Sequence, residues 1–254
     1  MKQIIIVLIF KINIMSKFIS TLLCCLIVGV MNAQTEEESK VKWDYPIKLG
    51  SAEWASFTTG QQMRDACQIP PKILETLSTK DLVEICLNYP LLSNYFYYND
   101  ERVGINRVIN GFNGLLELSN RKDCIQELIN VYKNYPVLTQ IPNNSSKDYH
   151  TPFKQASLEL LFSDDLFSKQ LDEQLAIELS KIVLEKYAGA VENIEIYGLY
   201  SIKKSLLLGA VVMDSQNISL LSAEQRATLK RFIENYNNLE PELLSETSKI
   251  ISGR

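Results

Sequence analysis

The stretch of residues 67–92 constrains the fold most, because residues that begin and end helices follow one another there in quick succession. Pro70 and Pro71 fit the first turn of a short helix, where proline loses no hydrogen bond and its fixed φ is already helical. Ser78 fits the N-cap of a second helix, with an acidic residue three positions later. Pro90 then ends that helix, because the residue before a proline is pushed out of the α region. The stretch predicts two short helices joined by a turn.

The second of these helices has one apolar face, formed by Leu82, Ile85, Cys86 and Tyr89 at i, i+3, i+4 and i+7. No segment alternates with period two for long enough to form a strand. We therefore predict an all-α fold of about nine or ten helices. Further helical segments are expected near residues 60–67, 105–116, 121–135, 153–162, 171–187, 193–213, 222–236 and 241–251.

Two helix boundaries are ambiguous in the sequence. Gly111 and Gly114 interrupt the segment that starts near residue 105, and each lowers helix stability by about 1 kcal/mol relative to alanine. That helix therefore needs tertiary packing, or it breaks near Gly114. Ser119 or Asn120 is the expected N-cap of the following helix.

A weak internal repeat suggests how the helices are arranged. Residues 77–92 and 118–138 both have Leu-Ser near their start and Asn-Tyr-Pro near their end. Tyr89 and Tyr135 are 46 residues apart, close to the period of armadillo and HEAT repeats, whose helix pairs stack into a superhelix. We expect either helix pairs stacked in such an armadillo- or HEAT-like α-superhelix or an irregular helical bundle.

The N-terminal residues 1–33 are typical of a signal peptide. Lys17 supplies a positive charge before the apolar residues 21–30, and Ala33 fits the last position before a cleavage site. Met15 could be the true start of the chain. A retained N-terminal anchor and a lipoprotein are the alternatives. The expected location is periplasmic or secreted.

Residues 34–53 are expected to form a tether and an extended segment, followed by a helical domain over residues 54–254. The clearest loop, residues 139–152, could divide that domain into two halves, and one continuous helical body is the alternative. Beyond the N-terminus no run of 18 apolar residues occurs, so no transmembrane segment is expected in the mature chain. The net charge of −4, without a basic cluster, argues against nucleic acid as a partner.

Catalytic and metal-binding patterns are scarce. The single histidine, His150, would have to pair with Cys67, Cys86 or Cys124 in a Cys–His hydrolase, and none of these cysteines lies in a nucleophile signature. A Cys67–Cys86 disulfide with one free thiol and three free thiols both remain open. We predict no catalytic residue, no metal and no cofactor. A hydrolase of peptide or glycan that uses an unrecognised pair of carboxylates remains the alternative.

The aromatic run Tyr95, Phe96, Tyr97 and Tyr98 is the best candidate for a binding patch, because tyrosine provides amphipathic contact area at interfaces. Its expected partner is an unidentified protein or peptide. A platform for a glycan or small molecule is an alternative function. The structural alternative is that these rings pack beneath the adjacent helices.

Several of these motifs together resemble a group of exported helical proteins of Bacteroidetes without an assigned function. The resemblance covers residues 54–135 and rests on Ala-Cys-Gln-Ile-Pro at 66–70, Leu-Ser-Thr-x-Asp-Leu at 77–82 and Leu-Asn-Tyr-Pro-Leu at 87–91. It implies export, and it implies no activity, cofactor or catalytic residue.

Overall fold

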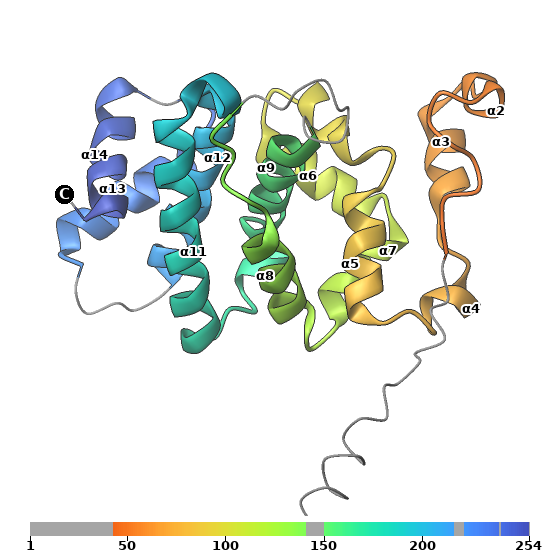
Figure 1. Cartoon of the computed structure of the whole chain (residues 1–254), viewed down its shortest axis with the longest axis horizontal. Helices are drawn as coiled ribbons and strands as arrows, with labels where there is room; N and C mark the ends of the chain where they lie inside the picture. Colours follow the sequence, from red (N-terminus) through yellow and green to blue (C-terminus); the bar gives the residue numbers. More distant parts are fainter. Residues whose placement is uncertain (1–42, 141–149, 216–220, 239, 254) are drawn as a thin grey trace, which may run out of the picture. The chain divides into compact units, whose positions relative to one another are not determined.

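The computed structural model describes residues 43–140, 150–215, 221–238 and 240–253, and within these ranges the chain is helical and contains no strand. This confirms the predicted all-α class, with ten helices of seven or more residues. The elements are α2 (Ala52–Ala55), α3 (Gly60–Cys67), α4 (Pro71–Leu74), α5 (Thr79–Leu87), the 3₁₀ helix η1 (Leu92–Tyr97), α6 (Glu101–Asn110), α7 (Asn113–Asn120), α8 (Cys124–Asn134), α9 (His150–Phe162), α10 (Asp165–Ser168), α11 (Glu173–Glu192), α12 (Ile194–Ser215), α13 (Ala223–Glu234) and α14 (Pro241–Ser252) (Figure 1).

Side-chain caps begin several helices where the sequence predicts them. Thr59 and Ser222 each form a complete capping box with a glutamine three residues later. Ser78 Oγ accepts a hydrogen bond from the Asp81 N–H at the start of α5. Each such bond satisfies a backbone donor that the first turn leaves unpaired. The predicted cap at Ser119 or Asn120 is wrong: α7 continues to Asn120, and α8 begins after Asp123.

The break between α6 and α7 lies at Gly111 and Phe112, earlier than the predicted break near Gly114. A side chain at the start of α7 explains the position. Asn113 accepts a hydrogen bond from the Ile69 N–H at 3.0 Å and donates one to the Ile69 carbonyl at 2.8 Å. This pair of bonds ties the beginning of α7 to the linker between α3 and α4.

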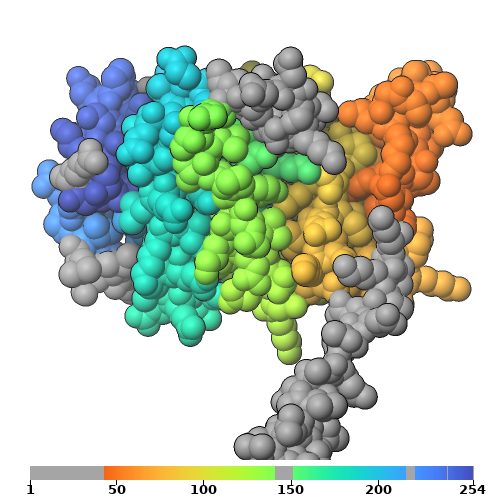
Figure 2. Space-filling view, viewed as in Figure 1, coloured from red at the N-terminus to blue at the C-terminus, as the bar shows by residue number. Residues whose placement is uncertain are grey.

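The helix α9 packs against α5, α6 and α8 from the preceding part of the chain and against α12 from the following part. Every side chain from Gln155 to Ser163 is buried, and little of α9 is visible in the space-filling view (Figure 2). The helix α9 is therefore a core helix, although it carries the buried polar residues Gln155, Ser157 and Glu159. It begins at His150, so residues 150–152, predicted as loop, are helical, while residues 141–149 of that loop lie outside the described ranges.

The longest helix, α12, is interrupted at Gly198, where φ is 68° and ψ is 159°. A positive φ of this kind is readily adopted only by glycine. Within the described part of the chain, α12 is the one helix long and apolar enough to cross a membrane, and 56% of its apolar window is buried inside the fold. The core helix of a globular protein can have the same length and apolar composition, so these two properties do not distinguish a core helix from a membrane-spanning helix.

Candidate functional site

The four residues of the predicted aromatic patch differ sharply in exposure. Tyr95 is fully buried, whereas Phe96 is 45%, Tyr97 is 85% and Tyr98 is 41% exposed. The Tyr95 hydroxyl is hydrogen-bonded to Ser157 Oγ of α9 at 3.3 Å. Tyr95 therefore holds η1 against the core and cannot be a contact residue, which corrects one of the four predicted positions.

One exposed side chain from α12 packs against η1, and its neighbour in the chain is also exposed. The rings of Phe96 and Tyr200 are stacked with their centroids 5.4 Å apart, and Leu199, next to Tyr200 in the chain, is 72% exposed. We define the aromatic patch as Phe96, Tyr97, Leu199 and Tyr200. It joins residues about 100 positions apart in the sequence, at the kink where Gly198 interrupts α12.

Tyr98 belongs to a different part of the surface. It lines a small cavity of about 50 Å³ together with Arg64 of α3 and Arg107 of α6. The aromatic run 95–98 therefore does not form one continuous contact surface, because Tyr95 is buried and Tyr98 lines this separate cavity.

A buried lysine lies directly beneath the aromatic patch. Lys204 is fully buried, and its Nζ lies 3.2 Å from the centroid of the Tyr200 ring and 5.5 Å from that of Phe96. The same Nζ lies 3.3 Å from Oε1 of Glu101, the first residue of α6. Cation–π contacts strengthen when water is excluded. The ammonium group therefore links α12, η1 and α6 under the patch.

Glu101 also connects this lysine to α13. The hydroxyl of Tyr236, just beyond α13, donates to Glu101 Oε2 at 3.3 Å. Lys203 lies over the Tyr236 ring, with its Nζ 4.1 Å from the ring centroid. Tyr236 thus satisfies one oxygen of the Glu101 carboxylate, whereas Glu101 Oε1 and Lys204 Nζ are buried with only each other as a charged partner.

A second buried carboxylate, Glu159, lies in the middle of α9. Its Oε1 accepts hydrogen bonds from Tyr132 at 2.7 Å, Ser205 at 2.8 Å and Gln155 at 3.1 Å. Its Oε2 is buried and has no hydrogen-bond partner. Burial raises the pKa of Glu159 to about 7, against the lowering effect of these hydrogen bonds and of Lys204. Near neutral pH this carboxyl group is therefore partly protonated.

Burial acts on Lys204 in the opposite sense. It lowers the pKa of the ammonium group to about 8, although the neighbouring carboxylates Glu101 and Glu159 favour the charged form. We call Glu101, Glu159, Lys204 and Tyr236 the buried ionic cluster. It is fully enclosed, so its role is to hold η1, α6, α9 and α12 in register beneath the aromatic patch.

The sequence carried a signal for this cluster that our prediction missed. Glu159 is the only charged residue between Ala156 and Phe162, and Lys203 and Lys204 immediately precede an almost wholly apolar run in α12. A charge inside an apolar helical segment needs a buried partner. The partners lie on other helices, however, so the pairing itself requires the fold.

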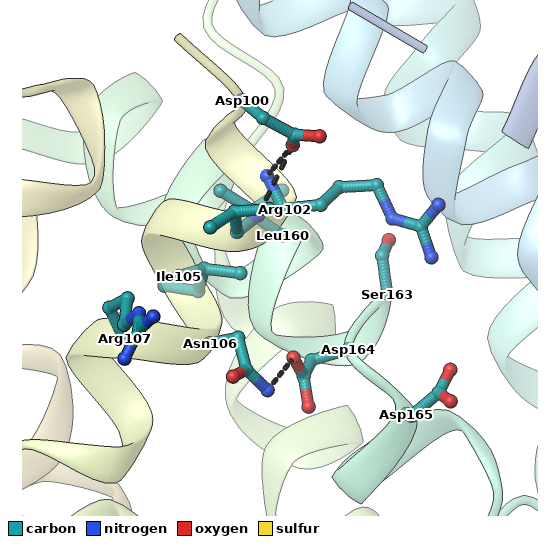
Figure 3. A pocket seen from close by; sticks show the side chains of 10 residues that line it. Asp100, Arg102, Ile105, Asn106, Arg107, Leu160, Ser163, Asp164 and Asp165 are labelled. Carbon is teal, nitrogen blue, oxygen red and sulfur yellow. Dashed lines mark hydrogen bonds between the residues drawn. The ribbon is translucent and has the colours of Figure 1, made fainter. Parts of the chain in front are cut away.

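A polar groove of about 440 Å³ lies between α6 and the link from α9 to α10 (Figure 3). Arg102 and Arg107 extend in different directions from α6, and the Arg102 guanidinium donates to the Ile233 carbonyl at 2.9 Å. Asn106 donates to Asp164 Oδ2 at 3.2 Å across the groove. This groove is the place where a hydrolytic pair of carboxylates would be sought.

Both central carboxylates of the polar groove already serve as helix caps. Asp100 accepts from the Arg102 and Val103 N–H groups, and Asp164 accepts from the Leu166 N–H. Burial favours a higher pKa for Asp100, but its hydrogen bonds outweigh that effect and lower the pKa. A carboxylate held ionised by capping bonds is poorly suited to act as a general acid.

An apolar groove of about 600 Å³ runs between the N-terminal segment, residues 44–49, and the beginning of α9. Tyr45 fixes one wall, because its hydroxyl donates to the Ile85 carbonyl of α5 at 2.8 Å. Ile47 and Leu49 line the same wall, and Phe153 and Lys154 line the wall formed by α9. We call this hollow the N-terminal groove.

The cysteine positions do not support nucleophilic chemistry. Cys67, Cys86 and Cys124 are free and buried. Burial raises the pKa of Cys67 and Cys124 to about 11 and also raises the pKa of Cys86, whereas a reactive cysteine needs a lowered pKa. Across the described ranges no group of three or more His, Cys, Asp or Glu residues is placed to hold a metal ion. His150 lies in the first turn of α9.

No protein-family model matches the chain, and no curated protein or solved structure is significantly similar to it.

Proposed function

We propose that the chain is an exported, non-enzymatic helical protein that binds another protein or a peptide in the cell envelope through the aromatic patch. The observation that carries the proposal is the packing of Phe96 on Tyr200 above a fully buried ion pair. Exposed aromatic side chains on a rigid support are the usual anchors of protein interfaces.

The rigid backbone of η1 and α12 beneath the aromatic patch favours a role of these rings in binding. Tyr95 and Lys204 anchor the two segments that carry the patch, so little backbone ordering is needed when a partner binds. The hydrolase alternative lacks a comparable observation, because Asp100 and Asp164 in the polar groove are engaged as caps. The alternative of a glycan or small-molecule platform would use the same rings, and the experiment below separates it from protein binding.

Site-specific photo-cross-linking in the native host tests the proposal. A benzophenone amino acid is placed at Tyr97, which is 85% exposed, and in a control protein at Ile177 of α11, an apolar residue that is 44% exposed. We expect a discrete protein adduct from position 97 and none of the same mass from position 177. The adduct should disappear when Phe96→Ser is added.

Two outcomes would contradict the proposal. Equal adducts from positions 97 and 177 would indicate non-specific contact, and the absence of a protein adduct at position 97 would favour the glycan or small-molecule alternative. The proposed export is tested separately by mass spectrometry of the protein from its own cells. Cleavage after Ala33 should leave Gln34 as the first residue, whereas a mature protein that begins at Met1 or Met15 would refute it.

A further inference from the structure

Two arginine side chains flank the small cavity that Tyr98 lines. Arg64 belongs to α3 and Arg107 to α6, and the volume of the cavity is about 50 Å³. A Cβ at Gly111 would come within 3.3 Å of Arg64 Cδ, so the stem of Arg64 lies against the end of α6. The Gln68 side chain also donates to the Gly111 carbonyl at 3.1 Å. These contacts fix Arg64 beside the last turn of α6, and we call the space the arginine cavity.

Arg64 forms no ion pair with a carboxylate among the described residues. Its guanidinium group donates to Gln61 Oε1 at 2.7 Å, and this acceptor is neutral. Asp65, the next residue in the chain, accepts from the Gln61 amide at 2.6 Å instead. A single hydrogen bond leaves most N–H groups of the guanidinium without a protein partner. The charge of Arg64 is therefore available to a ligand in the cavity.

Arg107 likewise has no ion pair in the described part of the chain. It also borders the polar groove, but the carboxylates at that end of the groove have other partners. Asp164 accepts from Asn106 at 3.2 Å, and Asp165 forms an ion pair with a lysine four residues later. Figure 3 shows the Arg107 side chain on the side of α6 away from both carboxylates. Since no acidic residue lines the arginine cavity, its lining carries a net positive charge.

A nearly buried tyrosine adds a neutral donor. Tyr89 is 5% exposed and lines the cavity, and its ring is stacked on Phe112 with the centroids 4.2 Å apart. Burial raises the pKa of its hydroxyl, and the positive charge of Arg64 acts against that rise, so the two groups lie close together. Within the described residues, neither this hydroxyl nor the side-chain amide of Asn94 in the same lining has a hydrogen-bond partner. Both groups can therefore donate to an anion in the cavity.

From these observations we propose that the arginine cavity binds a phosphate group, held by Arg64 and Arg107. Tyr89 and Asn94 serve as neutral donors to its oxygens. A volume of about 50 Å³ holds about three to five water-sized groups, which matches the oxygens of a phosphate and excludes a sugar or a nucleotide base. Guanidinium groups match phosphate in geometry and charge, and two of them offer more N–H groups than a carboxylate can accept. Both arginines are exposed, so the rest of a phosphate ester can remain in solvent, and the site does not depend on binding at the aromatic patch.

A titration of the full chain with inorganic phosphate at constant ionic strength, followed by phosphorus NMR, tests the inference. We expect saturable binding that Arg64→Gln and Arg107→Gln each weaken about 10-fold, because each removes a charged hydrogen-bond donor. Arg231→Gln, which changes an exposed arginine of α13, is the matched control and should leave the affinity unchanged. Tyr89→Phe keeps the ring stacked on Phe112 and removes only the hydroxyl, so a smaller loss is expected. Circular dichroism should show the same helix content in all variants.

Glycerol phosphate in place of inorganic phosphate identifies the source of the group. Tighter binding of the ester supports a phosphorylated molecule as the ligand, and equal or weaker binding supports the free ion; both results uphold the site. Absence of saturable binding, an unchanged affinity after Arg64→Gln and Arg107→Gln, or an equal loss in Arg231→Gln would overturn the inference. Acetate that binds as tightly as phosphate would overturn it too, since the cavity would then not select a phosphate group.

Discussion

At the scale of single residues, Glu159 is the most unusual side chain of the core. A carboxyl group without exposure, on a helix covered on all sides, is stable only with hydrogen-bond donors around it. Tyr132, Ser205 and Gln155 all donate to one of its oxygens, and the other oxygen has no partner. Gln155 Oε1 is likewise buried without a donor. Protonation of Glu159 Oε2 would turn this unpartnered acceptor into a hydroxyl group that can donate.

The ionisation of Glu159 should make stability depend on pH. Its pKa is about 7 in the folded protein and 4.5 as the unperturbed value. Between these values the folded state holds a proton that the unfolded state has released, so the free energy of unfolding falls as pH rises through this window. We expect Glu159→Gln to remove that dependence. Relative to the original protein, the variant should gain up to about 3 kcal/mol in free energy of unfolding between low pH and pH 7. Urea unfolding of both proteins at pH 4.5, 6 and 7.5 measures this pH dependence. Equal pH profiles for the two proteins would contradict the raised pKa of Glu159.

The Glu101–Lys204 pair should show strong coupling. Lys204→Met keeps most of the side-chain volume but leaves the Glu101 carboxylate buried without its cation, which typically costs about 3 kcal/mol. Adding Glu101→Gln removes the unpaired charge and retains an acceptor for the Tyr236 hydroxyl. The double variant should therefore be more stable than Lys204→Met alone, as measured by denaturant unfolding. Additive destabilisation in the double variant would show that the pair is not coupled.

Sequence reasoning could identify the polar residues of the core but could not pair them. Glu159 and Lys204 each interrupt an apolar segment, which marks them as buried charges. The partners on other helices are distant in sequence: Ser205 lies 46 residues from Glu159, and Glu101 lies about 100 residues from Lys204. Such pairings depend on which helices become neighbours, and helical periodicity carries no information about that.

At the scale of elements, the contact between η1 and α6 determines the position of the aromatic patch. Gly104 of α6 lies against the backbone of Tyr95, and a Cβ at this position would approach the Tyr95 carbonyl oxygen to 2.5 Å. Since that oxygen belongs to the backbone, only a shift of the whole η1 segment could relieve the overlap. A small residue at position 104 is therefore a requirement for the observed placement of Phe96 and Tyr97.

Gly104→Ala should accordingly destabilise the protein by about 1–3 kcal/mol, the usual cost of overpacking. Gly60→Ala is the matched control, because a Cβ there meets only the end of the Arg64 side chain at 3.5 Å. We expect the control to be as stable as the original protein or slightly more so. Thermal unfolding compares the two variants. Equal melting temperatures would mean that η1 can move without loss.

The boundaries of individual helices show where local sequence signals suffice. The capping boxes at Thr59 and Ser222 are of this local kind, because their donors and acceptors lie within three residues of each other. The break before α7 was predicted near Gly114 but lies at Gly111 and Phe112, where Asn113 bonds to Ile69. That bond spans 44 residues, and the sequence near Gly114 does not reveal it.

At the scale of the whole molecule, the stability of the described region rests on packing, because its three cysteines are free. We expect Cys67, Cys86 and Cys124 to resist a thiol reagent in the native protein and to react fully in guanidinium chloride, since burial both shields them and raises their pKa. Mass spectrometry of the labelled peptides measures this. Rapid labelling of any of the three without denaturant would contradict the structure.

The all-α class followed from periodicity, whereas the central position of α9 did not. Residues 153–162 were predicted to form a helix, and nothing in that prediction singled the helix out as central. The structure covers this helix on all sides, with α5, α6 and α8 from one part of the chain and α12 from another. The completely apolar run Leu160–Phe162 indicates burial, but the identity of the covering helices is a property of the tertiary fold.

The position of α9 has a consequence for the order in which the chain can fold as it is synthesised. The helices α5, α6 and α8 leave the ribosome first, but part of their apolar surface is covered only by α9. Glu159 in turn needs Ser205, which is synthesised 46 residues later. Early segments of such a chain remain without their packing partners during synthesis. We therefore expect the helices from α5 to α12 to acquire stable structure together, only after α12 has emerged, which would leave the nascent chain unfolded for most of its synthesis.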